Sequence, residues 1–448
     1  MTKRNIKVTS RQVAIGQGGL MTCQIEVSDG LTSPLLFNFA FDCGSINREH
    51  LKQGIETLDR GVLDILFISH LDADHINGID LLLDKMDVKT VVLPCLDALQ
   101  ATAIVCEALN GTGLTGDFRS FLLNPAIWFS QRGVQRVIYI SRDGGNDEVT
   151  PFTIDGPGPL KKSRGLRDEQ SQGRRLNYSL QSNGTAPQIL QTRTSSIEIE
   201  TASTENAFEI DLDSFSATNN IGLTWLLVPY VHPFPKDRID AFRRSVRAAL
   251  VVPAGESLAS AAFTKRLLDT LKYDDKRELL KACYAILCPD NNKPSLSLYS
   301  GPHQRPNQVW RIRRPHRYFW DYPHGLAPHL HSFVIPPLNL IQDGGGWLCT
   351  GDADLRSKGT RKAWLSRYKN LLEQVTVFIL PHHGSNASLD DEVISRMKGT
   401  ITVACAAQGR AHHPHPTLIA RLRDEGVAVW HVSEEMNTTF SMQVLGSP

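Results

Sequence analysis

Four side chains that could bind a metal ion lie within six positions of the sequence, directly after an apolar run. The run is Leu63–Ser69, and the segment HLDADH that follows it contains His70, Asp72, Asp74 and His75. The first three alternate, so an extended backbone would place them on one side of the chain, and His75 would open a helix. Imidazole and carboxylate in this combination suit Zn, Mn or Fe. The alternative is a polar turn with solvated charges, which the density of ligand-type residues disfavours.

Three later segments also place ligand-type side chains at the end of an apolar run. WLCT is followed by GDAD, in which Asp352 could bridge two metal ions, although a structural turn explains this short motif equally well. VFIL is followed by PHHGSN, whose paired His382 and His383 favour ligand or catalytic roles. ITVACAA precedes HHPHP, which contains His413 and His415. A proline-rich helix entry with surface imidazoles remains the alternative for this last motif.

Short apolar runs alternate with helical periodicity near both ends of the chain, which predicts a layered α/β core. The expected strands are Met21–Val27, Leu35–Phe41, Leu63–Ser69, Thr90–Leu93, Ser295–Tyr299, Ser332–Ile335, Trp347–Thr350, Val375–Leu380 and Ile401–Ala406. The expected helices are Glu49–Leu58, Ile76–Met86, Asp237–Ala249, Leu258–Leu287, Arg361–Leu372, Asp391–Lys398 and Thr417–Glu425.

The middle of the chain differs in composition from the two ends. We therefore predict that residues 1–110 and 285–448 form two halves of one domain, and that residues 111–284 are an insertion. Within this insertion, residues 160–206 are rich in Ser, Gln, Gly, Asn and Arg, with few large apolar side chains. Such a segment buries too little apolar surface to offset its ordering entropy. We expect it to be exposed and flexible, and the rest of the insertion to be partly helical.

Overall composition excludes several classes of protein. The 448 residues carry a formal net charge of +1, which excludes a polycation that coats nucleic acid along its whole surface, though not a local basic groove. The first residues have charges but no apolar core, and no run of about twenty apolar residues occurs, so we expect neither a secretory leader nor membrane association. The eight cysteines are scattered without a CxxC pair, which predicts buried free thiols and a cytoplasmic location.

The motifs HxDxDH, GD and HHGS, in this order, resemble those of the metallo-β-lactamase superfamily. Within it, the chain most resembles the hydrolase domain of the ComEC competence proteins and their stand-alone relatives. Ile15–Gly19 (IGQGG), Phe41–Gly44 (FDCG) and HPHP extend the resemblance, which covers roughly residues 10–100 and 285–435. Asp72 replaces a histidine of the commoner HxHxDH pattern, as in the ComEC type, and Gly19 stands where that type often has Asp. The histidine that many relatives have before the GD strand has no counterpart with a recognisable motif.

The resemblance implies an αββα sandwich, with the metal site at an edge between two sheets. By matching residues, it implies a site for two Zn or Mn ions, and it assigns the roles that follow. The metal ligands are His70, Asp72, Asp74, His75, Asp352 and His382 or His383. Asp42 would orient ligands. The catalytic candidates are Asp74, His383, His413 and His415, of which His413 or His415 would border the substrate.

The expected activity is metal-dependent hydrolysis through a metal-bound hydroxide, most plausibly of a phosphodiester in nucleic acid. A basic and aromatic stretch from Trp310 to Trp320 supports a nucleic-acid substrate, with Arg311, Arg313, Arg314 and Arg317 as phosphate-binding candidates. A solvated charged face with the aromatics buried behind it explains the same stretch equally well. Two alternatives are a metallohydrolase of a small ester, lactone or phosphocholine-like substrate, and a non-catalytic binding module. A partner protein and a role in bacterial defence are suggested by the resemblance alone.

Overall fold

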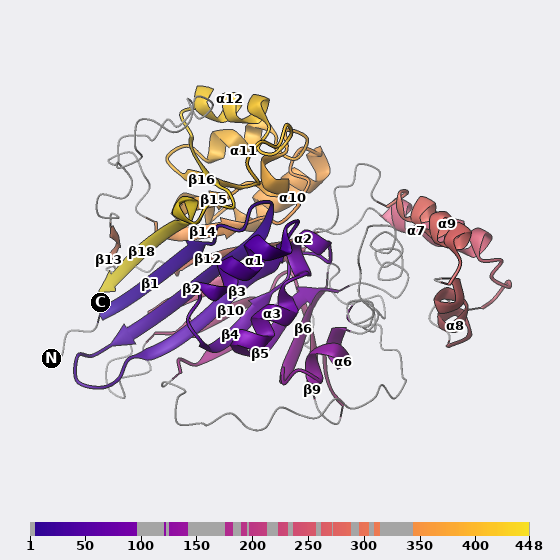
Figure 1. Ribbon diagram of the computed structural model, residues 1–448, viewed down its shortest axis with the longest axis horizontal. Helices are drawn as coiled ribbons and strands as arrows, with labels where there is room; N and C mark the ends of the chain where they lie inside the picture. The colour runs from indigo at the N-terminus through magenta and orange to yellow at the C-terminus, as the bar shows by residue number, and fades with distance from the viewer. Residues whose placement is uncertain are drawn as a thin grey trace.

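The computed structural model describes residues 5–95, 121, 125–141, 175–181, 190–194, 197–212, 223–231, 236–256, 261–270, 272–287, 295–303, 309–313 and 344–447. Within these residues the chain forms two large mixed β-sheets with helices against them (Figure 1). The expected α/β class is therefore confirmed.

The larger sheet contains strands from the first third, the middle and the C-terminus of the chain. Its order is β13 (Val309–Arg313), β18 (Phe440–Ser447), β1 (Asn5–Gln12), β2 (Gly18–Ser28), β3 (Leu35–Ser45), β4 (Gly61–Phe67), β5 (Met86–Pro94), β6 (Arg136–Ser141), β9 (Ile197–Ser203) and β8 (Leu190–Thr194). The strands from β3 to β9 are parallel, and the other neighbours are antiparallel. Strands β1 and β18 pair along their length, which joins the two ends of the chain.

The smaller sheet is also mixed, and its strands come from the middle and the last third of the chain. Its order is β17 (Ala428–Val432), β16 (Ile401–Cys405), β15 (Val375–Ile379), β14 (Gly346–Cys349), β12 (Leu296–Pro302), β11 (Thr224–Val231), β10 (Ala207–Asp211) and β7 (Tyr178–Gln181). Strands β14 to β17 are parallel. Both sheets thus have a parallel portion, and the carboxyl ends of neighbouring parallel strands meet at one edge of a sheet.

Apolar side chains fill three layers. Between the sheets, Phe37, Phe67, Trp225 and Trp347 belong to one buried cluster. A second cluster lies between the larger sheet and its helices α1 (Arg48–Glu56), α3 (Ile79–Lys85) and α6 (Pro125–Ser130). A third lies between the smaller sheet and α10 (Lys358–Tyr368), α11 (Asp391–Arg396) and α12 (Pro416–Asp424). The sheets therefore face each other, with helices outside both.

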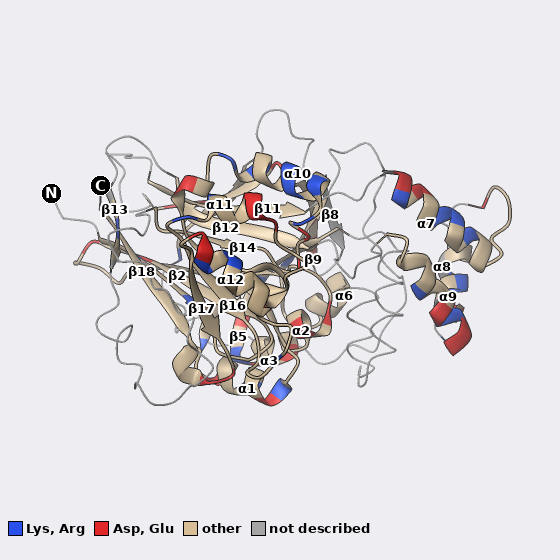
Figure 2. Ribbon diagram, turned by 90° about the horizontal axis from the view of Figure 1, so that it is seen from above, with Lys and Arg blue, Asp and Glu red and all other residues tan. Residues whose placement is uncertain are grey.

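Three helices lie to one side of the sheets. These are α7 (Lys236–Ala249), α8 (Ala261–Thr270) and α9 (Asp274–Tyr284), which stand apart from the strands in both Figure 1 and Figure 2. The sequence predicts one helical stretch over Leu258–Leu287, whereas the structure ends α8 at Thr270 and begins α9 at Asp274. Acidic residues in the first turn suit this new helix start.

The middle segment contributes strands to both sheets. The sequence predicts that residues 160–206 are exposed and flexible, and their described portion includes β7, β8 and β9. Polar residues conceal these strands in the sequence; Glu200 in β9, for example, is buried where it pairs with Arg136. The described strands of residues 111–284 continue the two sheets, and α7–α9 are the helical part. The expected strand Ser332–Ile335 lies outside the described residues.

Gly44 permits the close approach that brings α2 (Ala73–Ile76) against β3. A Cβ atom on Gly44 would lie 2.4 Å from the backbone nitrogen of Ile76 and 2.5 Å from the backbone of His75. Backbone cannot yield as a flexible side chain can, so we expect Gly44→Ala to lower the free energy of unfolding by about 3 kcal/mol. Urea unfolding measures this. Gly61→Ala is the matched control, because its Cβ would meet nothing within 4 Å. Equal stability of the two variants would contradict the steric explanation.

Candidate metal centre

The residues expected to do chemistry meet at strand ends from both sheets. Asp42 lies near the end of β3, and His70 follows β4, in the larger sheet. Asp352 follows β14, and His382 and His383 follow β15, in the smaller sheet. Because β3 is parallel to β4 and β14 to β15, each pair delivers its side chains to the same edge. The site therefore lies between the two sheets.

Asp42 fixes the position of His75 and of the residue before His70. Its Oδ1 accepts the backbone N–H of Ser69 at 2.7 Å, and its Oδ2 accepts the Ser69 hydroxyl at 2.7 Å. The same Oδ2 lies 2.8 Å from Nδ1 of His75. A hydrogen bond from Nδ1–H to a carboxylate directs Nε2 of His75 into the cluster, where it becomes a ligand when a cation displaces its proton.

Two groups of potential ligand atoms share His75. The first contains His70, His75 and Asp352, and the second contains Asp74, His75 and His383. Nε2 of His70 and Nε2 of His75 lie 3.6 Å and 3.4 Å from different carboxylate oxygens of Asp352. In the second group, Nε2 of His383 lies 3.2 Å from Oδ2 of Asp74. The ligand atoms of each group are within 4.8 Å of one another, close enough to bind one ion together.

Asp72 and His382 lie at the edge of the first group. Oδ2 of Asp72 is 3.7 Å from Nε2 of His70, and Nε2 of His382 is 3.9 Å from Oδ2 of Asp352. Both side chains keep 26% of their surface exposed, whereas His70 and His75 are almost completely buried. They are therefore the ligand candidates that solvent or a substrate reaches most readily.

The innermost atoms of the first group lack hydrogen-bond partners among the described residues. Nε2 of His70, Nε2 of His75 and Oδ1 of Asp352 are all buried in this state. Burying polar atoms without partners is unfavourable, and a divalent cation would satisfy all three. A cavity of about 30 Å³ is bounded by His75, Asp352 and His383, among other residues. The nitrogen and oxygen donors suit a transition metal ion, so these residues fit a metal.

The electrostatics of the cluster agree with this arrangement. Burial alone would raise the pKa of Asp352, but His70 and His75 hold it well below its usual range. Burial also opposes the charged form of His75, yet Asp42 and Asp352 raise its pKa well above the ordinary value. The pKa of His70 is lowered by burial and by His75. Asp352 is thus ionised, and it holds a positive charge at the centre of the cluster.

The His382–His383 pair has an unusual backbone. Both residues have left-handed φ angles, of 48° and 56°, and Asp42 has a φ of 59°. Such conformations cost of order 1–3 kcal/mol each in residues other than glycine, and they cluster at functional sites. Among the described residues, three of the four non-glycine positions with positive φ therefore belong to this cluster.

The HHPHP motif divides between two environments. The ring of His413 stacks on His382, with ring centroids 5.3 Å apart, and also contacts His383. Burial and these neighbouring histidines lower the pKa of His413 to about 4. His415 instead caps α12, where its Nδ1 accepts the backbone N–H of Thr417 at 3.2 Å. His413 thus borders the cluster, whereas His415 has a structural contact that explains its position.

Two serines of the cluster were not assigned a role from sequence. The Ser69 hydroxyl lies 2.9 Å from Nδ1 of His70, and the Ser295 hydroxyl accepts the backbone N–H of Asp352 at 3.0 Å. Ser295 also lies 3.5 Å from Nδ1 of His70. The sequence signal for these two roles is position alone, since Ser69 ends one predicted strand and Ser295 begins another. A serine at a strand end is too common to assign without the structure.

The basic and aromatic stretch lies elsewhere in its described part. Trp310 is buried against Trp225, with ring centroids 5.5 Å apart, and so is not available to stack on a base. Arg311 is exposed on the edge strand β13, where it pairs with Leu445 of β18. The cluster lies five residues further along β18, at Phe440, which pairs with Gln12 beside the small cavity. Arg311 is therefore about 17 Å along the sheet from the ligands. The side chain of Arg313, and all of Arg314 and Arg317, lie outside the described residues.

Comparison with models of known protein families gives no match, and comparison with curated proteins gives none. Among the described residues, no helix combines the length and apolar character needed to cross a bilayer. The six cysteines within them are buried thiols that form no disulfide, as the sequence predicts.

Proposed function

We propose that this chain is a metal-dependent hydrolase of the metallo-β-lactamase superfamily, most similar to its ComEC type, and that its two facing sheets are the αββα sandwich of that superfamily. One observation carries the proposal. Three buried ligand atoms, on His70, His75 and Asp352, face one another without hydrogen-bond partners among the described residues. Motif order and strand-end positions support the same conclusion.

The proposed ligands divide between two sites for Zn or Mn. His70, His75 and Asp352 would hold one ion, with Asp72 or His382 at its edge. Asp74 and His383 would hold the other, because the single free nitrogen of His75 can bind only one of the two ions. A bound divalent ion supplies Lewis acidity, which stabilises negative charge on phosphodiester oxygens and makes water a stronger acid. Asp42 keeps His75 in the tautomer that presents Nε2.

Phosphodiester hydrolysis is the reaction we favour. Two adjacent ligand groups fit the paired ions that phosphodiesterases and nucleases use. The ring of His413 stacks on that of His382 at the border of the cluster. In this position it would orient the substrate or exclude water from the cluster. Nucleic acid is the proposed substrate, through the resemblance to the ComEC type.

A second candidate is hydrolysis of a small ester or phosphodiester. The positions of Trp310 and Arg311 favour it, because this described part of the basic stretch offers the cluster neither a stacking ring nor a nearby cation. A non-catalytic module would bind the metal but hydrolyse nothing.

Metal analysis and a substrate panel test the proposal. We expect purified protein to carry one or two equivalents of Zn or Mn by elemental analysis. We expect it to hydrolyse DNA or RNA, and also bis-nitrophenyl phosphate as a generic phosphodiester. Activity on the small ester alone would favour the second candidate. The double variant Asp74→Ala, His75→Ala controls for contaminating nucleases. Absence of bound metal, with no activity after Zn or Mn is added, would refute the proposal.

A further inference from the structure

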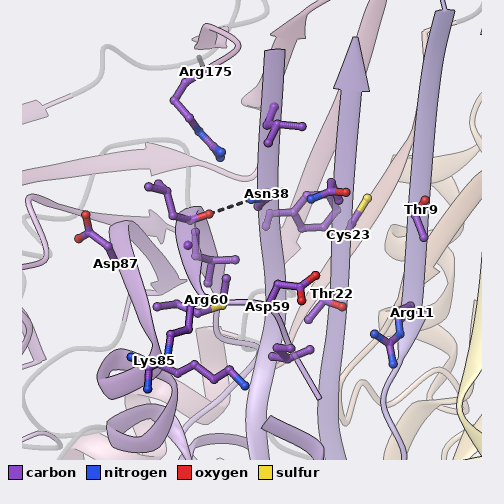
Figure 3. Close-up of a pocket in the computed structure, with 18 residues that line it drawn as sticks. Thr9, Arg11, Thr22, Cys23, Asn38, Asp59, Arg60, Lys85, Asp87 and Arg175 are labelled. Atoms are coloured by element: carbon purple, nitrogen blue, oxygen red, sulfur yellow. Dashed lines mark hydrogen bonds between the residues drawn. The ribbon is translucent and has the colours of Figure 1, made fainter. Parts of the chain in front are cut away.

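The outer face of β1, β2 and β3 is polar where the helices stop covering it. The inward side chains of these strands, such as Val8 and Ile25, belong to the core between the sheets. The opposite face presents Thr9, Thr22 and Asn38. Against this face, the turn before β4 and the start of β5 enclose a cavity of about 650 Å³ (Figure 3). That volume lies within the range of small-molecule sites.

This cavity is separate from the metal cluster. Gly61 and Val62, which line it, open β4, whereas His70 follows the end of that strand. At about 3.3 Å per residue, the two ends of β4 are about 20 Å apart. A ligand here would therefore not touch the proposed metal ligands.

The cavity has an excess of positive charge. Two of its charged residues are already compensated: Arg175 pairs with Asp64, and Asp87 pairs with Lys89. Arg11, Arg60 and Lys85 remain, with Asp59 as the opposing carboxylate. Figure 3 shows Arg60 and Lys85 on one side of the floor and Arg11 on the other. Neither arginine has a carboxylate partner among the described residues, whereas Lys7, on the same face of β1, pairs with Glu26.

We propose that this cavity binds a phosphorylated small molecule. Guanidinium groups match the geometry and charge of phosphate, and three cations around one volume favour a ligand with at least two negative charges. The polar floor offers hydroxyl and amide groups to a sugar or similar body. Phe39 is the aromatic residue of the described lining, and it is fully buried, so the cavity lacks the stacking platform of a single-strand site.

Titration calorimetry at low salt tests this proposal. The probes are sodium pyrophosphate, ADP, glucose 6-phosphate and a twelve-nucleotide DNA strand. Each is titrated into the full chain and into Asp74→Ala, His75→Ala, which removes phosphate binding at the metal cluster. We expect at least one small phosphate to bind both proteins. Arg11→Gln and Arg60→Gln should each weaken that binding about tenfold, and Lys7→Gln, which removes the same charge from the same face, should leave it within about twofold.

The outcomes separate this proposal from the proposed function. Equal weakening in all three charge variants would show non-specific attraction and overturn the site. So would the absence of small-phosphate binding, or binding that vanishes in the metal-cluster variant. Preference for ADP over glucose 6-phosphate would assign the site to nucleotides, and the reverse to sugar phosphates. Tighter binding of the DNA strand than of every small phosphate, with loss in Arg11→Gln, would overturn the small-molecule assignment. Hydrolysis of bis-nitrophenyl phosphate should stay unchanged in Arg11→Gln and Arg60→Gln.

Discussion

Asp352→Asn is expected to abolish tight metal binding and to lower phosphodiester hydrolysis by about 10³-fold or more. Asp352 contributes both carboxylate oxygens to the cluster, one facing His70 and the other facing His75. Asparagine keeps the size of the side chain but removes the negative charge that balances a cation. Elemental analysis and initial rates on bis-nitrophenyl phosphate measure the two losses.

Asp354→Asn is the matched control for this variant. This substitution removes the same charge two residues away. Oδ1 of Asp354 accepts the backbone N–H groups of Arg356 and Ser357, and the amide oxygen of asparagine can accept them as well. We expect this control to keep its metal and most of its activity. An Asp352→Asn protein that retains wild-type metal content and rate would remove the central support for the proposed function.

Asp42→Ala is expected to lower the free energy of unfolding by about 3–5 kcal/mol and metal affinity by about 10–100-fold. The change leaves the N–H and hydroxyl of Ser69 and the Nδ1 of His75 without their buried acceptor. It also frees the ring of His75 to rotate. Urea unfolding and zinc titration measure these two effects.

Asp42→Asn separates the structural effect from the electrostatic one. An amide oxygen can still accept from Ser69, so we expect a loss of stability of about 1–2 kcal/mol, smaller than for alanine. The charge that pairs with His75 is gone, so the loss of metal affinity should persist. The exposed residue Asp59, replaced by alanine, should change neither quantity by much. Wild-type zinc affinity in Asp42→Asn would show that Asp42 only stabilises the fold.

The sequence predicts the ligand-rich strand ends well because the information there is local. The apolar run ends at Ser69 and is followed at once by His70 and Asp72. One short segment therefore predicts both the strand and the ligand-type residues at its end. Parallel pairing aligns the strand ends within each sheet, and the packing of the two sheets brings those ends together with Asp352; the sequence shows neither directly. The left-handed backbone of His382 and His383 is not visible in the sequence, because histidine, although enriched there, adopts this conformation far less often than glycine.

Long-range pairing explains what the sequence does not predict. Strand β1 has only Ile6 and Val8 as large inward residues, and its pairing with β18 depends on contacts across the whole chain. Strand β9 contains a buried Glu200 whose partner Arg136 lies far away in sequence. The composition of this segment predicts flexibility because composition cannot show that Glu200 has a partner in another strand. Trp310 is the opposite case. Its neighbouring arginines suggest a role in binding, whereas the structure packs its ring against Trp225.

The two-sheet origin of the cluster has a consequence for folding entropy. His75 and Asp352 are separated by more than half of the 448-residue chain. His75 lies in α2, which follows strand β4 of the larger sheet, whereas Asp352 follows strand β14 of the smaller sheet. An ion held by both closes a very long loop, as a disulfide would, and it binds the native state in preference to the unfolded chain. A bound metal ion would therefore act as a reversible cross-link between the two layers. Chelation would lower the thermal midpoint of the whole molecule, and neither half of the chain alone could form the cluster.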